Sequence, residues 1–301
     1  MIIKESPSIM QLFFSSKGSV VPKIISKIIT LTSLSVMVIL LDTYVIKLPH
    51  ISIQVMGVFG VALSLFLGFR NNAAYDRWWE ARKLWGVLIA DVRNLGRHLN
   101  IFVGKGEARE SLLSYTIAYA HLHRGALRNI NVRKEILPWV GEQAADTLLS
   151  KKNPADASLN VIAEKIKDLE QKGKISGYGL LTISQTLASF AEAQAGCERI
   201  KSTPLPFVYS LLVGRTTYLY LFLLPFALIE AASWFAPVFT AVVAYVFFGL
   251  QAVTDELERP FMNVQNGLPL DAMCRNIEIS VCEALDRQPP DELKPKDHLL
   301  T

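Results

Sequence analysis

Few residues in this 301-residue sequence have a type and spacing that could do chemistry. Arg215 lies inside a long apolar stretch, where an ionised side chain is costly and usually faces the interior of a helix bundle or water. Pairing with a polar group of another helix and lining of a water-filled pore are both open for it. If the chain were a membrane enzyme or a small-molecule carrier, Arg215 would bind the anionic group.

The other candidate residues do not indicate catalysis. The sequence contains no zincin helix, P-loop or nucleophile-elbow motif. His121 and His123 are two residues apart, so a helix would point them in nearly opposite directions, and we expect both on a helix surface. Cys197, Cys274 and Cys282 include no closely spaced pair of the kind that binds zinc. We therefore expect no catalytic residue, no metal site and no cofactor.

The elements that would hold such residues are membrane helices. Hydrophobic residues make up 51% of the chain and charged residues 19%, against about 25% charged in soluble domains. A helix needs about 17–25 mostly apolar residues to cross a bilayer. Four stretches qualify, namely residues 24–46, 51–69, 205–229 and 231–254. The sequence therefore predicts an all-α membrane protein with four transmembrane helices and a lipid bilayer as its surroundings.

The distribution of lysine and arginine predicts the orientation of these helices. In membrane proteins, lysine and arginine are more frequent in the short segments that flank membrane helices on the cytoplasmic side. Lysines precede the first helix and four basic residues follow the second, whereas the turn between them holds only Lys47. We predict a multi-pass protein of the cell (inner) membrane with both termini in the cytoplasm. The net charge is +4, but the lysines and arginines lie mostly between apolar stretches, where membrane topology already requires them. We therefore expect no nucleic-acid partner.

This orientation divides the chain into five parts. We expect a cytoplasmic N-terminal segment, two membrane helices, a cytoplasmic helical region, two further membrane helices and a cytoplasmic C-terminal segment, over residues 1–23, 24–69, 70–204, 205–254 and 255–301. Directly after the last membrane helix stand three carboxylates, Asp255, Glu256 and Glu258. We interpret them as a solvated helix end rather than as a metal site.

The second membrane helix carries two patterns at helical spacing. Small residues recur every three or four positions, which permits close packing of helices; they are Gly57, Gly60, Ser64 and Gly68. A neighbouring apolar stripe recurs every four positions; it consists of Val61, Leu65 and Phe69. If several copies surrounded an axis, this stripe would form stacked hydrophobic rings, which can gate a pore by dewetting. Contact with lipid or with another helix is the alternative interpretation.

The end of this helix resembles the bestrophin family of pentameric channels, in particular its prokaryotic members. The resemblance is carried by Leu67-Gly68-Phe69 followed by Arg77-Trp78-Trp79. It is supported by residues 196–199 (Gly-Cys-Glu-Arg), 203–209 (Thr-Pro-Leu-Pro-Phe-Val-Tyr) and 256–261 (Glu-Leu-Glu-Arg-Pro-Phe). It covers about residues 10–280.

The resemblance implies a homopentamer with a central pore, four membrane helices per subunit and a large cytoplasmic helical portion. The family's apolar neck would fall at Val61, Leu65 and Phe69. A second constriction, at the cytoplasmic mouth, would fall at Tyr178, or at Leu180 or Leu181 if the preceding loop carries a gap.

The resemblance also implies the activity, which is passive conduction of monovalent ions. Prokaryotic members resemble cation channels, so sodium and potassium are expected, whereas animal members conduct chloride and leave an anion channel as the alternative. Animal members bind calcium through a dense acidic cluster, but residues 262–271 here contain one carboxylate, Asp271. Calcium takes about six to eight oxygen ligands, so calcium binding is not expected. A non-conducting membrane scaffold is a further alternative.

Overall fold

The computed structural model describes residues 1–3 and 18–301, so most of the expected N-terminal segment 1–23 lies outside the described residues. Within these residues the regular secondary structure is helical, and β-pairing is limited to isolated bridges. The chain forms two compact units. We call them the apolar unit, with described residues 18–78 and Pro204–Arg259, and the polar unit, with Met1–Ile3, Trp79–Thr203 and Pro260–Thr301.

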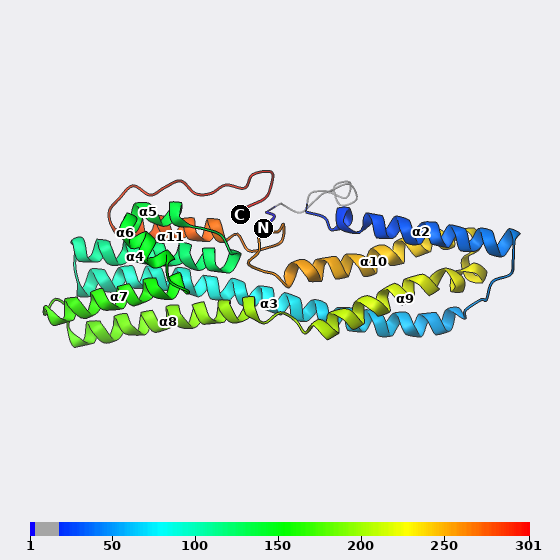
Figure 1. The fold of residues 1–301 in the computed structure, drawn as a ribbon, viewed down its shortest axis with the longest axis horizontal. Helices are drawn as coiled ribbons and strands as arrows, with labels where there is room; N and C mark the ends of the chain where they lie inside the picture. The colour runs from blue at the N-terminus through cyan, green and yellow to red at the C-terminus, as the bar shows by residue number, and fades with distance from the viewer. Residues whose placement is uncertain (4–17) are drawn as a thin grey trace. The chain divides into compact units, whose positions relative to one another are not determined.

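The apolar unit contains the helices of membrane-spanning length. Three stretches are long and apolar enough to cross a bilayer, and the third of them holds two helices. The elements are α2 (Val21–Tyr44), the first part of α3 (Ile53–Phe102), α9 (Phe207–Ala232), the short 3-10 helix η1 (Ser233–Phe235) and α10 (Ala236–Leu257). In Figure 1, α2 lies alongside α10, and α9 and α10 are antiparallel neighbours. The four predicted membrane helices are thus present.

Two boundaries in this unit differ from those that hydropathy predicts. The turn between the last two membrane helices lies at Ser233, whose φ of 46° ends α9, and not at Glu230, which is still helical. Helix α3 does not end with the apolar stretch at Phe69 but continues to Phe102. Hydropathy reports where a helix leaves an apolar environment, and a helix can continue into a polar one.

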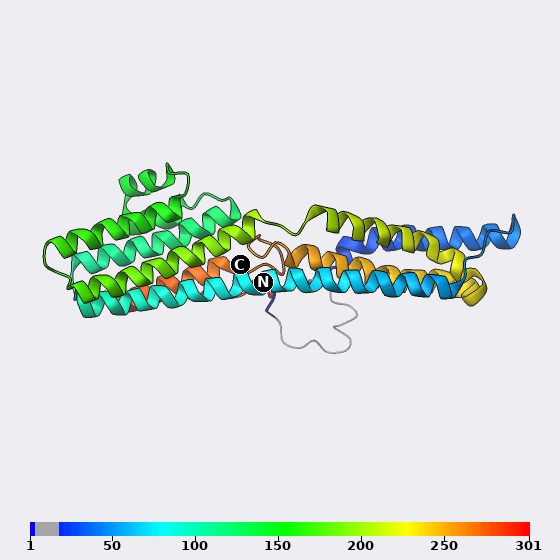
Figure 2. The same ribbon diagram turned by 90° about the horizontal axis from the view of Figure 1, so that it is seen from below.

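The polar unit is a bundle built around one central helix. Helix α4 (Glu107–Arg128) packs against α5 (Arg133–Val140), α7 (Pro154–Gln171), α8 (Gly177–Ser202) and α11 (Leu270–Ala284), while α6 (Glu142–Leu149) packs on α5 and α7. Figure 2 shows the bundle from below, with α7, α4 and α8 side by side. Because α4 has neighbours on several sides, most of its side chains are buried.

Candidate functional site

The first part of α3 has one packed face and one exposed face. Met56, Leu63 and Leu67 belong to the hydrophobic core of the apolar unit, together with residues of α2, α9 and α10. On the other face, the exposed fractions of the side chains of Val61, Leu65 and Phe69 are 70%, 56% and 56%. The predicted stripe is therefore a surface of the apolar unit and no part of its core.

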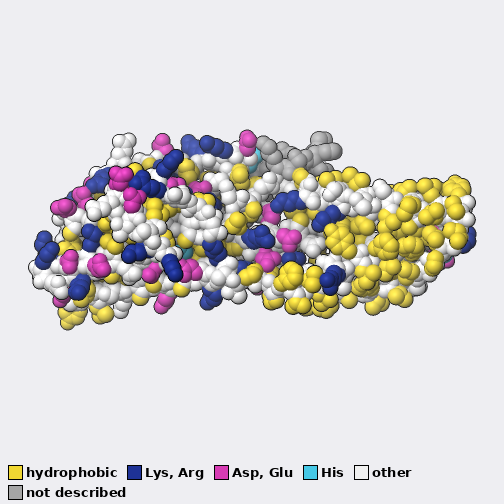
Figure 3. All heavy atoms as spheres, viewed as in Figure 1, with side chains coloured by type: hydrophobic (Ala, Val, Ile, Leu, Met, Phe, Trp, Pro, Cys, Tyr) yellow, Lys and Arg dark blue, Asp and Glu magenta, His cyan; other side chains and the backbone are white. Residues whose placement is uncertain are grey.

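Hydrophobic side chains extend over the rest of the apolar unit as well. Figure 3 shows them gathered on the face of this unit that it draws, whereas charged side chains of both signs are scattered over the polar unit. Exposed large hydrophobics include Ile29 on α2, Val208 and Leu212 on α9 and Val242 on α10. A contiguous apolar surface of this kind marks contact with lipid or with another protein chain.

The small residues of α3 do not all serve the same contact. A Cβ atom on Gly60 would lie 2.7 Å from the Tyr220 hydroxyl oxygen, so this glycine lets Tyr220 on α9 approach the α3 backbone. At Gly57 and Gly68 a Cβ atom would meet nothing within 4 Å in the described residues. Ser64 is exposed, and its hydroxyl donates to the Val61 carbonyl oxygen at 2.8 Å. Among the residues that the structure describes, Gly60 is thus the only position of the predicted small-residue stripe used for close packing.

Ion pairs of the buried Arg70 join α3 to α10 directly after Phe69. Arg70 is 3% exposed, and its Nη2 atom lies 2.8 Å from Asp255 Oδ1 and 3.3 Å from Glu258 Oε2. Lys23 on α2 lies 2.6 Å from Glu256 Oε1. The acidic run is therefore a set of helix-joining carboxylates rather than a solvated helix end. The sequence signal for this contact is Arg70, the basic residue that directly follows the apolar stretch of α3.

Arg215 is exposed on α9 and makes no hydrogen bond or ion pair with the described residues. Its neighbour Gly214 packs towards α10, where a Cβ atom would lie 3.5 Å from Gln251 Nε2. The pairing that the sequence leaves open for Arg215 is thus not made within the described part of this chain.

The three candidates for the second constriction lie in the first turn of α8. The Ser176 hydroxyl caps this helix by accepting from Gly179 N at 3.2 Å. Gly179 is buried against Phe102, since a Cβ atom at this position would lie 2.8 Å from the Phe102 ring. Tyr178 is 84% exposed and Leu181 59%, whereas Leu180 is half-buried. Of the three candidates, Tyr178 and Leu181 therefore have side chains that are exposed on the surface of the polar unit.

A histidine that the sequence did not single out joins two segments of the apolar unit. His50, in the turn between α2 and α3, has its Nδ1 atom 2.8 Å from Glu230 Oε1 and its Nε2 atom 3.3 Å from Asp42 Oδ1. The hydrogen bond with Glu230, followed by that with Asp42, raises the pKa of His50 above its usual value. A lone histidine in a four-residue turn was the only signal for this link.

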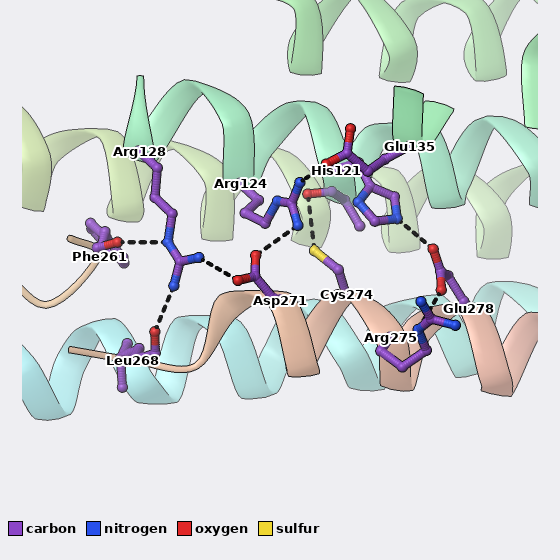
Figure 4. A network of polar contacts seen from close by, with 11 residues as sticks. His121, Arg124, Arg128, Glu135, Phe261, Leu268, Asp271, Cys274, Arg275 and Glu278 are labelled. Atoms are coloured by element: carbon purple, nitrogen blue, oxygen red, sulfur yellow. Dashed lines mark hydrogen bonds and ion pairs between the residues drawn. The ribbon is translucent and has the colours of Figure 1, made fainter. Parts of the chain in front are cut away.

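In the polar unit, two arginines of α4 hold Asp271, the one carboxylate of residues 262–271. Figure 4 shows Asp271 between Arg124 Nη1, at 2.7 Å, and Arg128 Nη1, at 2.9 Å. Burial disfavours the ionised form of Asp271, but Arg128 and Arg124 outweigh it and lower its pKa. Arg124 also contacts Glu135 at 2.7 Å. A carboxylate already bound by two arginines does not fit the role of a calcium ligand.

His121 and His123 are both buried, so the prediction that they lie on a helix surface is wrong. His121 Nε2 lies 2.7 Å from Glu278 Oε1 on α11, which also contacts Arg275 (Figure 4). His123 stacks between the rings of Trp85 and Tyr119, and burial lowers the pKa of His123 to about 3. The spacing places them on opposite sides of α4, but α4 is enclosed on both sides.

These surfaces and contacts belong to a chain with relatives among known proteins. The sequence matches a family described as bacterial/fungal bestrophin protein over residues 1–283. The voltage-dependent anion channel-forming protein mll4386 of Mesorhizobium japonicum is 42% identical over 97% of this chain and 95% of its own length. The voltage-dependent anion channel-forming protein YneE of Escherichia coli K12 is 32% identical over 99% of both chains. A crystal structure of a bacterial bestrophin homologue from Klebsiella pneumoniae matches with a TM-score of 0.84 at 30% identity, covering 88% of this chain and 100% of that one.

Proposed function

The chain belongs to the bacterial and fungal bestrophin family of ion channels, and from this membership we propose that it forms a homopentameric pore for the passive conduction of monovalent ions. One observation carries the proposal. The apolar stripe of Val61, Leu65 and Phe69 is exposed, while the opposite face of the same helix is packed in the core. A stripe with this exposure is what a pore-lining helix would present to the pore axis.

The stripe would act as the barrier of the pore. Five copies around an axis would make three stacked apolar rings, about 6 Å apart because a helix rises about 1.5 Å per residue. Apolar rings of small radius expel water, and an ion cannot cross a dry segment without losing its hydration. Conduction would therefore depend on widening or wetting of these rings. Tyr178 and Leu181, exposed at the start of α8, would form the second constriction.

Two observations bear on the charge of the permeant ion. The names of the relatives from Mesorhizobium japonicum and Escherichia coli describe anion channel-forming proteins, which favours an anion such as chloride. The resemblance to prokaryotic bestrophins favours sodium and potassium instead. Reversal potentials under a sodium chloride gradient decide between the two, because a cation pore and an anion pore shift the potential in opposite directions.

We also propose that the polar unit and both termini lie in the cytoplasm of a bacterial cell, below the inner membrane. Basic residues support this orientation. Lys23 and Arg70 lie at one end of the apolar unit's helices, and the turn between α2 and α3 holds Lys47 as its only lysine or arginine. Labelling of single cysteines introduced at Ser52 and Ser202 by a membrane-impermeant maleimide in spheroplasts tests this orientation, since only the first would react.

The decisive experiment is the simultaneous substitution Val61→Ala, Leu65→Ala and Phe69→Ala, recorded in planar lipid bilayers. Smaller side chains widen the rings, so we expect a higher open probability and a larger single-channel conductance. The matched control is Val208→Ala, Leu212→Ala and Leu219→Ala, which removes exposed apolar side chains from α9. An unchanged conductance and open probability in the first variant would contradict the assignment of the neck.

The mass of the purified complex tests the assembly separately. A pentamer has five times the chain mass of 33.5 kDa. A monomer with saturable substrate uptake that is lost in Arg215→Gln would instead establish the carrier alternative.

A further inference from the structure

We infer that the polar unit carries a binding site for a small soluble phosphate ester, in the groove between α3, α4 and the C-terminal end of α11. Ion conduction does not require such a site, so the inference goes beyond the proposed function. The groove has a volume of about 510 Å³. Sites for small organic molecules typically measure about 300–1,000 Å³, so the groove is large enough for a ligand with an organic body.

The groove has an excess of positive charge. Four cationic side chains and two carboxylates line it, so two positive charges are left over; they are Arg93, Arg97, Lys105 and Arg109 against Glu283 and Asp286. Lys105 Nζ and Asp286 Oδ2 neutralise one another at 2.7 Å. The remaining excess belongs to the arginines, which attract an anion.

Two of the arginines have only neutral partners among the described residues. Arg93 Nε donates to the Ser280 hydroxyl at 3.1 Å, and Arg97 Nη1 donates to the Asn94 side-chain oxygen at 3.1 Å. Arg93 and Arg97 are four residues apart on α3, so their side chains leave the helix on the same face. Each guanidinium retains donors for a further acceptor, and a planar guanidinium binds phosphate through two parallel hydrogen bonds.

The third arginine is buried at the wall of the groove and lacks a partner for one donor. Arg109 is 6% exposed, and its Nη2 atom donates to the carbonyl oxygen of Ala284 at the end of α11. Its Nε atom is buried and has no hydrogen-bond partner in the described part of the chain. Burial of a charged guanidinium is costly when its charge is incompletely compensated, and an anionic group in the groove would stabilise this side chain electrostatically.

The chemistry of the lining distinguishes a phosphate ester from simpler anions. A phosphate monoester carries about −1.5 to −2 charges at pH 7, which matches the excess of two, whereas a carboxylate carries one. The half-buried Ala284 and the aliphatic stems of Arg93 and Arg97 give the groove apolar walls. These walls would contact the organic body of the ester, which inorganic phosphate lacks.

Binding of phenyl phosphate to the full-length protein in detergent, measured by calorimetry at constant ionic strength, tests the inference. We expect saturable binding that is stronger than that of inorganic phosphate or benzoate. In Arg93→Gln with Arg97→Gln, binding should weaken about tenfold or more because charge-assisted hydrogen bonds are lost. The control, Lys167→Gln with Lys172→Gln, removes two exposed lysines of the same unit and should bind like the wild type.

A second variant keeps the charges and changes only the shape. Gly96 lines the groove, and a Cβ atom there would lie at ordinary contact distances of 3.8 Å from Ala284 and 4.0 Å from Leu113. Gly96→Ala should therefore fold, since alanine favours a helix more than glycine does. It should weaken phenyl phosphate binding and leave inorganic phosphate binding unchanged.

Three results would overturn the inference. The first is the absence of saturable binding of phenyl phosphate to the wild type. The second is equal binding by the arginine double variant and the lysine control. The third is binding of phosphatidic acid in nanodiscs without any binding of phenyl phosphate. The site would then recognise the phosphate of a lipid and not that of a soluble ester.

Discussion

Gly60 shows at the level of one residue how closely α3 and α9 approach. A Cβ atom there would lie 2.7 Å from the Tyr220 hydroxyl oxygen and 3.2 Å from its Cζ atom, so Tyr220 must move in Gly60→Ala. Overpacking of this kind destabilises a protein by about 1–3 kcal/mol, and we expect a lower melting temperature of the purified protein. In the control Gly249→Ala, the new Cβ atom lies 3.9 Å from Ile24 Cδ1, an ordinary contact. Equal melting temperatures in the two variants would contradict the close approach.

His50 makes stability depend on pH. Glu230 and Asp42 raise the pKa of His50 in the folded protein. A histidine with a raised folded pKa contributes stability that is fully present below its unfolded pKa of about 6.5 and is lost as the pH rises through the folded value. The melting temperature of the wild type should therefore fall, relative to that of His50→Gln, as the pH rises from acid through that value. Glu230→Gln should reduce this dependence, because Glu230 is its largest cause.

Residue-level predictions from the sequence were right where spacing along one helix was sufficient. The four-residue spacing of Val61, Leu65 and Phe69 correctly predicts that they share one face. The surface position of His121 was wrong because spacing gives the direction of a side chain but not the number of helices around it. The link between His50 and Glu230 joins residues 180 positions apart, which no local pattern reveals.

At the level of elements, Arg70 joins α3 to α10. Removal of one partner of a fully buried ion pair costs about 3–5 kcal/mol, and Arg70→Ala should cost less because Asp255 is more than half exposed. We expect a clear fall in the melting temperature and partial rescue by Arg70→Lys. The control Arg133→Ala breaks the exposed pairs with Glu142 and Asp146 and should change stability by about 0–1 kcal/mol. Similar effects of the two alanine variants would show that the Arg70 pairs are not structural.

The existence of the membrane helices could be predicted from the sequence, and their ends could not. Helix α3 passes from apolar to polar residues after Phe69 without a proline anywhere in its 50 residues. Nothing in this stretch breaks a helix, so hydropathy marked a change of surroundings and not an end. The turn at Ser233 lies among apolar residues, where hydropathy has no contrast to detect.

At the level of the whole molecule, the three cysteines report on opening of the polar unit. Burial raises the pKa of Cys197 and of Cys274 to about 12, and that of Cys282 above its usual value. The reactive form is the thiolate, so the folded protein at pH 8 should resist a maleimide, and denaturant should expose all three thiols. Ser184→Cys places a thiol at an exposed position of α8 and should react at once. Rapid labelling of the native wild type would contradict the burial of these residues.

The exposed stripe on α3 has a consequence for biogenesis. A single newly inserted chain would present Val61, Leu65 and Phe69 to acyl chains, in which apolar side chains are well solvated. Assembly of the proposed ring of subunits would replace that lipid by a narrow apolar pore segment, which water enters unfavourably. These side chains therefore oppose subunit association, and the attraction between subunits must come from other faces of the chain. Shortening them should make association easier while making the membrane leakier, so yield of assembled protein and tightness of the barrier would change in opposite directions.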